Sequence, residues 1–434
     1  MKLLEQIKQL DFPADLPETV LNVHQTFDAP DVGDIDAAVQ KALKEDGLLA
    51  RMKPGATVAV GVGSRGIANI PQITKATVDG LRAAGMKPFV LPAMGSHGGA
   101  TAEGQKEVLT NLGVTEASVG CEIKATMEVQ QIGQIPDGPP LYQDVLSAGA
   151  DHCILISRIK PHTDFRSHLE SGPSKMCVIG WGKQFGAAIM HGGGGANFQK
   201  YLAPAARIYE TNTNFVGAVS VVENAYDGTA KIVGLTADKV GLEPEAKLLE
   251  RPKPSWPTCL SPKLIFWWSA DGQEYQRHRH GHQHHQPSAH SAPAEEFGNI
   301  DIAVIAVLDL TEETHGNACG FGLANITPRV VNKTDWVATY TNTITSGIFG
   351  MYRTSMPLTM PTDKSALEVA MRGCARPWAD ARMVFIDDTL TLDNIWVSPN
   401  LREAVEAHPR LSIKGEYKLE FDDCGTMQYP WALC

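Results

Sequence analysis

The sequence predicts an α/β protein built from two α/β domains with mainly parallel sheets and a cleft between them. Apolar runs of strand length alternate with helical patterns along most of the chain, which is typical of sheets covered by helices. The 434 residues exceed what one ordinary hydrophobic core organises. We therefore expect an N-terminal α/β domain over 1–250 and a C-terminal α/β domain over 296–434, whose tail can return to the first domain.

The elements of the N-terminal domain follow one another with clear breaks. A helical pattern at 34–52 ends at Lys53-Pro54-Gly55. The first strand and helix then form one unit of an α/β fold, and the next strand and helix repeat it. Residues 121–146 indicate short strands and turns, and 142–151 indicates a helix. The other predicted elements are strands at 56–63, 87–93, 152–159, 215–225 and 230–238, and helices at 71–85 and from 102 onward.

Three of these strands end in loops whose residues can bind a ligand. Ser64 and Arg65 follow the first strand, where small neighbours allow close approach and a guanidinium can grip a carboxylate or phosphate. His97 follows the second strand and His162 the strand at 152–159. Ligands of open α/β sheets gather at the carboxyl ends of strands, and two imidazoles there could exchange protons with one substrate. A purely structural turn remains the alternative for Ser64-Arg65 and for His97.

Two more candidates lie in the stretch after His162. Lys175 stands between Gly172-Pro173 and the apolar run 176–179, where an ammonium is poorly solvated and its pKa shifts toward the neutral, nucleophilic form. His191 precedes the run Gly192–Gly195, which has no side chains to shield the imidazole, so we expect it to be freely presented to a ligand, although one histidine alone is a weak metal signal. A histidine at a helix end beside a flexible turn is the alternative. We assign His168 a solvent-facing role, and His315 either faces the cleft or is structural.

Residues 251–295 disagree with the rest of the chain, because two tryptophans are adjacent at 267–268 and histidines crowd 278–290. One interpretation is a metal-binding histidine tract. We favour a local frameshift. Read one nucleotide later, codons for 272–286 permit GKNISGTGMDTNIIN, which has the composition of a ligand-binding loop; 251–259 can likewise be reread as AQAKLADL. Resequencing the gene tests this hypothesis.

Composition excludes several classes of function. The net charge of −11 without a basic block argues against nucleic acid or an anionic membrane as partner. No apolar run is long enough to span a membrane, and the N-terminus lacks the apolar core of a signal peptide. The eight cysteines are scattered singly, which indicates reduced thiols. We expect a cytoplasmic protein with a small substrate, and leave its oligomeric state open.

The order His97, His162, Lys175 and His191 resembles the nickel-pincer lactate racemase family, together with GSRGIANIPQ, MGSHGGATAEG, KPH, ESGPSKM and the reread loop. The resemblance covers most of the chain. It implies a nickel-pincer nucleotide held covalently by Lys175, nickel ligation by His191, and general acid–base roles for His97 and His162. Arg65, with Ser64, would orient the cofactor phosphate or the substrate carboxylate. The implied activity is racemisation or epimerisation of a small 2-hydroxy acid.

The residues also favour a cofactor on chemical grounds, independently of the family resemblance. Side chains alone cannot carry a hydride, so a cofactor must carry it, and a cofactor tethered at Lys175 would meet this need. Two alternatives stay open. One is a non-catalytic binder of the nickel nucleotide or an inactive copy, favoured if 251–291 is real. The other is an unrelated α/β hydrolase or transferase with His97 or His162 as base, although no GxSxG elbow accompanies them.

Overall fold

The structure is a computed structural model that describes residues 2–64, 66–162, 165, 167–249, 264–267, 304–345, 351, 354–374, 378–387 and 392–428. The chain divides into two compact units. We name the two units by their place along the chain. The inner unit is Asp28–Lys253 with Thr345–Gly347, and the outer unit, which holds both ends of the chain, is Met1–Phe27, Pro254–Ile344 and Ile348–Cys434.

The inner unit contains a sheet of the strand order β3-β2-β6-β7-β8 among the described residues. The neighbours from β3 to β7 are parallel, and β8 pairs antiparallel with β7. Parallel order brings the carboxyl ends of β3, β2 and β6 to one edge of the sheet. The strands are β2 (Thr57–Val62), β3 (Lys87–Pro92), β6 (His152–Arg158), β7 (Phe215–Glu223) and β8 (Thr229–Thr236).

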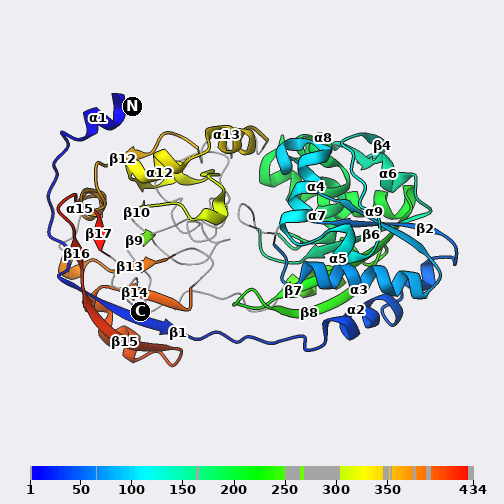
Figure 1. The fold of residues 1–434 in the computed structure, drawn as a ribbon, viewed down its shortest axis with the longest axis horizontal. Helices are drawn as coiled ribbons and strands as arrows, with labels where there is room; N and C mark the ends of the chain where they lie inside the picture. The colour runs from blue at the N-terminus through cyan, green and yellow to red at the C-terminus, as the bar shows by residue number, and fades with distance from the viewer. Residues whose placement is uncertain are drawn as a thin grey trace. The chain divides into compact units, whose positions relative to one another are not determined.

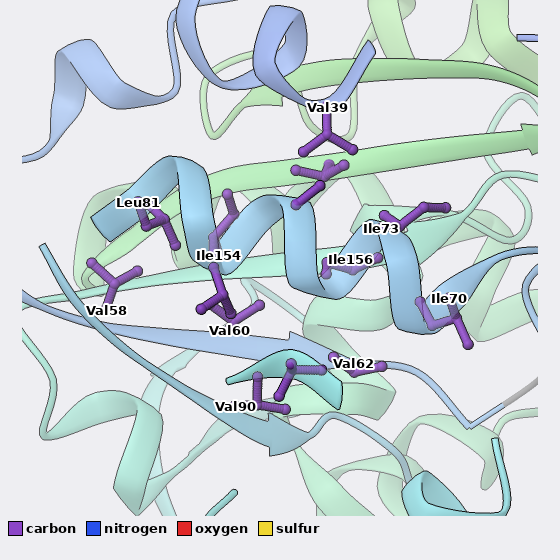
Figure 2. Packing of buried hydrophobic residues seen from close by; sticks show 14 of the residues in the cluster. Val39, Val58, Val60, Val62, Ile70, Ile73, Leu81, Val90, Ile154 and Ile156 are labelled. Atoms are coloured by element: carbon purple, nitrogen blue, oxygen red, sulfur yellow. The ribbon is translucent and has the colours of Figure 1, made fainter. Parts of the chain in front are cut away.

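Helices cover both faces of this sheet (Figure 1). On one face α2 and α3 pack on alternate strand residues such as Val58 and Val60. Figure 2 shows Leu81 of α3 near Val58, and Ile73 of the same helix near Ile156. The other face is covered by a π-helical segment and α9. The helices are α2 (Ile35–Lys44), α3 (Ile70–Ala83), α4 (Ala102–Asn111), α5 (Glu116–Val119), α6 (Val145–Ala148), α7 (Pro173–Met176), the π-helix Cys177–Trp181, α8 (Lys183–His191), α9 (Gly194–Asn212) and α10 (Glu243–Leu249); β4 (Val129–Gln134) and β5 (Pro140–Asp144) form a hairpin.

The outer unit contains, among the described residues, a sheet of the order β12-β11-β10-β9-β13-β14-β1-β15. Its strands are parallel from β12 to β13 and antiparallel from β13 to β15. The strands are β1 (Thr19–Gln25), β9 (Leu264–Trp267), β10 (Val304–Val307), β11 (Asn325–Ile326), β12 (Leu358–Thr359), β13 (Met383–Ile386), β14 (Asn394–Val397) and β15 (Leu411–Lys418), with the hairpin β16 (Glu420–Phe421) and β17 (Met427–Gln428). The helices include α1 (Lys2–Ile7), α12 (Pro328–Lys333), α13 (Trp336–Thr345), α15 (Asp363–Gly373) and α16 (Arg402–Glu406).

The predicted α/β class with mostly parallel strand pairing in the main sheets is confirmed. The domain boundary at the N-terminus is wrong, because β1 pairs with β14 and β15 of the outer unit and buries Leu21 and Val23 completely. Antiparallel pairing can join strands far apart in sequence, so no local signal marks this return. The chain's beginning therefore belongs to the sheet of the outer unit.

The helix expected at 142–151 is confirmed only over Val145–Ala148, which forms α6. Strand β5 continues to Asp144, whose side chain accepts hydrogen bonds from the backbone N–H groups of Leu146 and Ser147 and caps the short helix α6. Within the anomalous range 251–295 only 264–267 is described, as a strand between β10 and β13. The proposed frameshift windows lie outside the described residues. No helix among the described residues is long and apolar enough to cross a membrane.

Candidate functional site

Three predicted site residues follow neighbouring strands at the carboxyl edge of the inner sheet. His97 follows β3, Ser64 follows β2 and His162 follows β6, and β2 lies between the other two strands. Adjacent strands are about 4.8 Å apart, so the loops that carry these residues emerge side by side. The predicted strand-end positions are therefore confirmed. Arg65 lies outside the described residues.

The loop of His162 is closed by a buried carboxylate. The backbone N–H of His162 donates to Glu170 Oε2 at 2.5 Å, and the N–H of Ser167 donates to Glu170 Oε1 at 3.4 Å. Glu170 is 4% exposed. The His162 ring stacks on Phe165 with centroids 4.3 Å apart and is itself 9% exposed. One carboxylate thus fixes the backbone, while an aromatic face fixes the plane of the imidazole.

Phe198 of α9 brings three predicted residues together. Its ring centroid lies 6.2 Å from that of His162 and 4.9 Å from that of His191, which it meets edge-on. Lys175 Nζ lies 5.5 Å from the same centroid, within the distance at which an ammonium is attracted to a ring face. Phe165 stacks on Phe198 at 5.4 Å. We call these five residues the Phe198 cluster.

The short helix α7, which carries Lys175, is anchored by a buried glutamate. Glu245 of α10 accepts hydrogen bonds at Oε1 from the N–H and the hydroxyl of Ser174, at 3.1 and 2.8 Å, and at Oε2 from the N–H of Gly241 at 2.7 Å. Burial raises the pKa of Glu245, and these hydrogen bonds oppose the rise. A Cβ at Gly172 would lie 2.4 Å from Glu245 Oε1, so glycine is required for this approach.

His191 ends α8 and is not freely presented, in contrast to the expectation. The glycine run that follows does not form an open loop, because Gly194 and Gly195 are buried at the start of α9. That helix returns Phe198 against the imidazole. His191 Nδ1 lies 2.7 Å from the carbonyl oxygen of Ala187. A carbonyl only accepts, so Nδ1 carries the proton and Nε2 carries the lone pair that a metal requires.

The loop of His97 is a tight turn on α4 and α8. Gly98 has φ +65, and a Cβ there would lie 2.3 Å from the backbone carbon of Gly104. A Cβ at Gly95 would lie 3.2 Å from Ala187 Cβ of α8, the helix that ends at His191. The loop that carries His97 thus packs on α8, and α8 ends at His191 of the Phe198 cluster.

The remaining histidine predictions differ in outcome. His168 is solvent-exposed as expected, and its Nε2 lies 3.3 Å from Glu243. His315 is exposed and adopts a left-handed turn at φ 48, several residues beyond the end of β10. This conformation makes His315 a turn residue in the outer unit.

Sequence reasoning missed Phe198, Glu170 and Glu245. The spacing 198, 201, 202, 205, 206 and 209 along α9 is an apolar helical face and indicates only core packing. Glu170 begins the quoted motif ESGPSKM, but nothing in that motif indicates a carboxylate that closes the His162 loop, and Glu245 has no motif around it. In the described part of the chain, no group of three or more His, Cys, Asp or Glu side chains is placed to hold a metal ion. The chain matches no protein-family model and no curated protein.

Proposed function

We propose that the chain is a racemase or epimerase of small 2-hydroxy acids that carries a nickel-pincer nucleotide attached covalently to Lys175. The observation that supports this most directly is the convergence of Lys175, His162 and His191 on the Phe198 ring. An amine for attachment, an imidazole for proton transfer and an imidazole for a metal are the three functions that the proposal requires.

The donor set fits such a cofactor. The tautomer of His191 directs a lone pair to Nε2, and the carbonyl of Ala187 fixes the ring, as second-sphere partners do at metal sites. A single histidine is a weak site alone, so the proposal assigns the other nickel ligands to the cofactor. The chemistry that this group would supply when bound is reversible hydride transfer at the substrate carbon.

The chain's own residues would bind the substrate and move its proton. His162, with its ring plane fixed by Phe165, and His97, which follows β3 two strands away at the same sheet edge, would alternate as base and acid toward the substrate hydroxyl. Imidazole changes protonation near neutral pH, and such transfer is worth about 10²- to 10⁴-fold in rate. The hydroxyl proton taken by one imidazole is given back after the planar keto acid has formed. The cleft between the two domains, which the sequence predicts, also belongs to this proposal.

A chiral assay tests the function. Full-length chain from a host that makes the cofactor is incubated with single enantiomers of a 2-hydroxy acid panel, and chiral chromatography follows the opposite enantiomer. We expect one substrate to racemise or epimerise. His97→Gln and His162→Gln should abolish exchange and retain the cofactor mass, whereas His168→Gln, on the exposed side of the loop, should leave exchange unchanged. Loaded protein without exchange on any substrate would instead indicate a non-catalytic carrier.

A further inference from the structure

Lys183 combines two unfavourable features, and no motif in the sequence drew attention to it. Its side chain is fully buried, at 0% exposure. Its backbone adopts the left-handed conformation with φ 52 at the start of α8. Lysine is almost never fully buried unless it is paired, and a non-glycine residue in this region carries backbone strain. Both features persist only where surrounding contacts over-determine them.

The contacts of the ammonium lead directly to the His97 loop. Lys183 Nζ donates to the carbonyl oxygen of Pro92 at 2.6 Å and to Gln105 Oε1 at 2.9 Å, and it lies 3.4 Å from Asp144 Oδ2. These partners match the three N–H donors of an ammonium. They come from the end of β3, from α4 and from the end of β5, so one side chain joins three elements to α8.

Gln105 extends the same network along the loop backbone. It is fully buried, and its Nε2 donates to the carbonyl oxygens of Met94 and Gly95 at 3.0 and 2.9 Å. Lys183 and Gln105 therefore hold three backbone carbonyls within the few residues that precede His97. The other end of α8 is His191, which contacts Phe198.

We propose that Lys183 is a positioning residue, which holds the His97 loop at a fixed place on α8 through Pro92, Gln105 and Asp144. Its importance for catalysis rests on the proposed function, in which His97 transfers a proton. A misplacement of about 1 Å at such a group costs about 100-fold in rate. The lysine thus differs from Lys175: it makes no covalent bond and touches no substrate.

The pairing of Lys183 with Asp144 in the protein interior decides which variants are informative. Burial lowers the pKa of Lys183 and raises that of Asp144, and their mutual attraction opposes both shifts. Removing one partner leaves the other charge buried without compensation. The test variant is therefore the double change Lys183→Met with Asp144→Asn, which removes both charges. The asparagine keeps the Oδ1 acceptor that caps α6.

Hydrogen–deuterium exchange of the full chain, read by mass spectrometry, tests the inference. The amides of Ala93, Ala100 and Thr101 donate within this region to Val62, Ser96 and Gly98. In the double variant we expect peptides over 93–101 to exchange about 10-fold or more faster, the loss of about 1.4 kcal/mol of local protection. Val39→Ala, on the opposite face of the sheet, is the control for general destabilisation.

Exchange that rises evenly across the inner unit, or stays unchanged at 93–101, overturns the inference. If the double variant fails to fold, Gln105→Leu must loosen 93–101 by the same criterion. The exchange experiment needs neither cofactor nor substrate. An intact wild-type chain without racemase activity would thus refute the proposed function and leave the anchoring of the loop standing. In an active enzyme the double variant should lower kcat about 100-fold and change KM little; an equal effect of Val39→Ala contradicts the positioning role.

Discussion

Replacing Phe198 by leucine separates the role of its ring from that of its bulk. Phe198 is 2% exposed and meets Phe165, His162, His191 and Lys175. Leucine keeps an apolar side chain in the core but provides no ring face or edge. Each aromatic pair contributes about 0.5–1.5 kcal/mol beyond its buried area, and the ammonium contact about 0.5–1 kcal/mol.

Because these terms share one ring and are not additive, we expect Phe198→Leu to lower the free energy of unfolding by about 1–3 kcal/mol. At about 2–4 °C per kcal/mol for a unit of this size, Tm falls by about 2–12 °C. The folded protein should persist at 25 °C, so cofactor retention and racemisation can be measured on it. We expect both to fall about 10-fold or more, because Lys175, His162 and His191 lose their shared contact.

The matched control is Phe215→Leu. Phe215 begins β7 in the same unit, is 5% exposed, and belongs to the same hydrophobic cluster. Differential scanning calorimetry should give the two variants comparable losses in Tm. Phe215→Leu should retain the cofactor and activity. Equal functional losses in both variants, or full activity in Phe198→Leu, would refute the claim that the ring organises the site.

Two further predictions concern the residues that hold the loops. Burial raises the pKa of Glu245 above its ordinary value of 4.5, so its contribution to stability is full below pH 4.5 and is lost as the pH rises through the folded-state pKa. Glu245→Gln should remove that slope from urea unfolding between about pH 4 and pH 8; an unchanged slope contradicts the assignment. Gly98→Ala and Gly99→Ala both place alanine at positive φ, but only at Gly98 would the Cβ meet Gly104, at 2.3 Å. Gly98→Ala should therefore lower Tm and activity more, and equal effects contradict the packing.

Local sequence patterns were sufficient to predict the positions of the loops that carry candidate catalytic and binding residues. Alternating strands and helices indicated the parallel sheet, and this placed Ser64, His97 and His162 at one edge. The helical end at His191 was foreseen as an alternative. These features depend on short-range periodicity and on the rule for strand ends, which sequence records directly.

Contacts between segments that are far apart in the chain have no comparable local pattern in the sequence. Phe198 lies on an apolar helix face that core packing alone requires, and Glu245 is one acid among several in its segment. The burial of Lys183 depends on Pro92 and Asp144, which are far from it in sequence. Strand β1 pairs with β14 and β15 across most of the chain. Such pairings arise from tertiary packing, which single-residue patterns do not encode.

The central claim is that Lys175 anchors a cofactor beside the imidazoles that contact Phe198. Peptide-level mass spectrometry of the full chain, purified from a host that makes the nickel-pincer nucleotide, tests it most directly. The claim predicts a nucleotide-derived mass on the peptide that contains Lys175, lost in Lys175→Ala and retained in His97→Gln. An unmodified Lys175 under those conditions, or the adduct on another lysine such as Lys183, would contradict it.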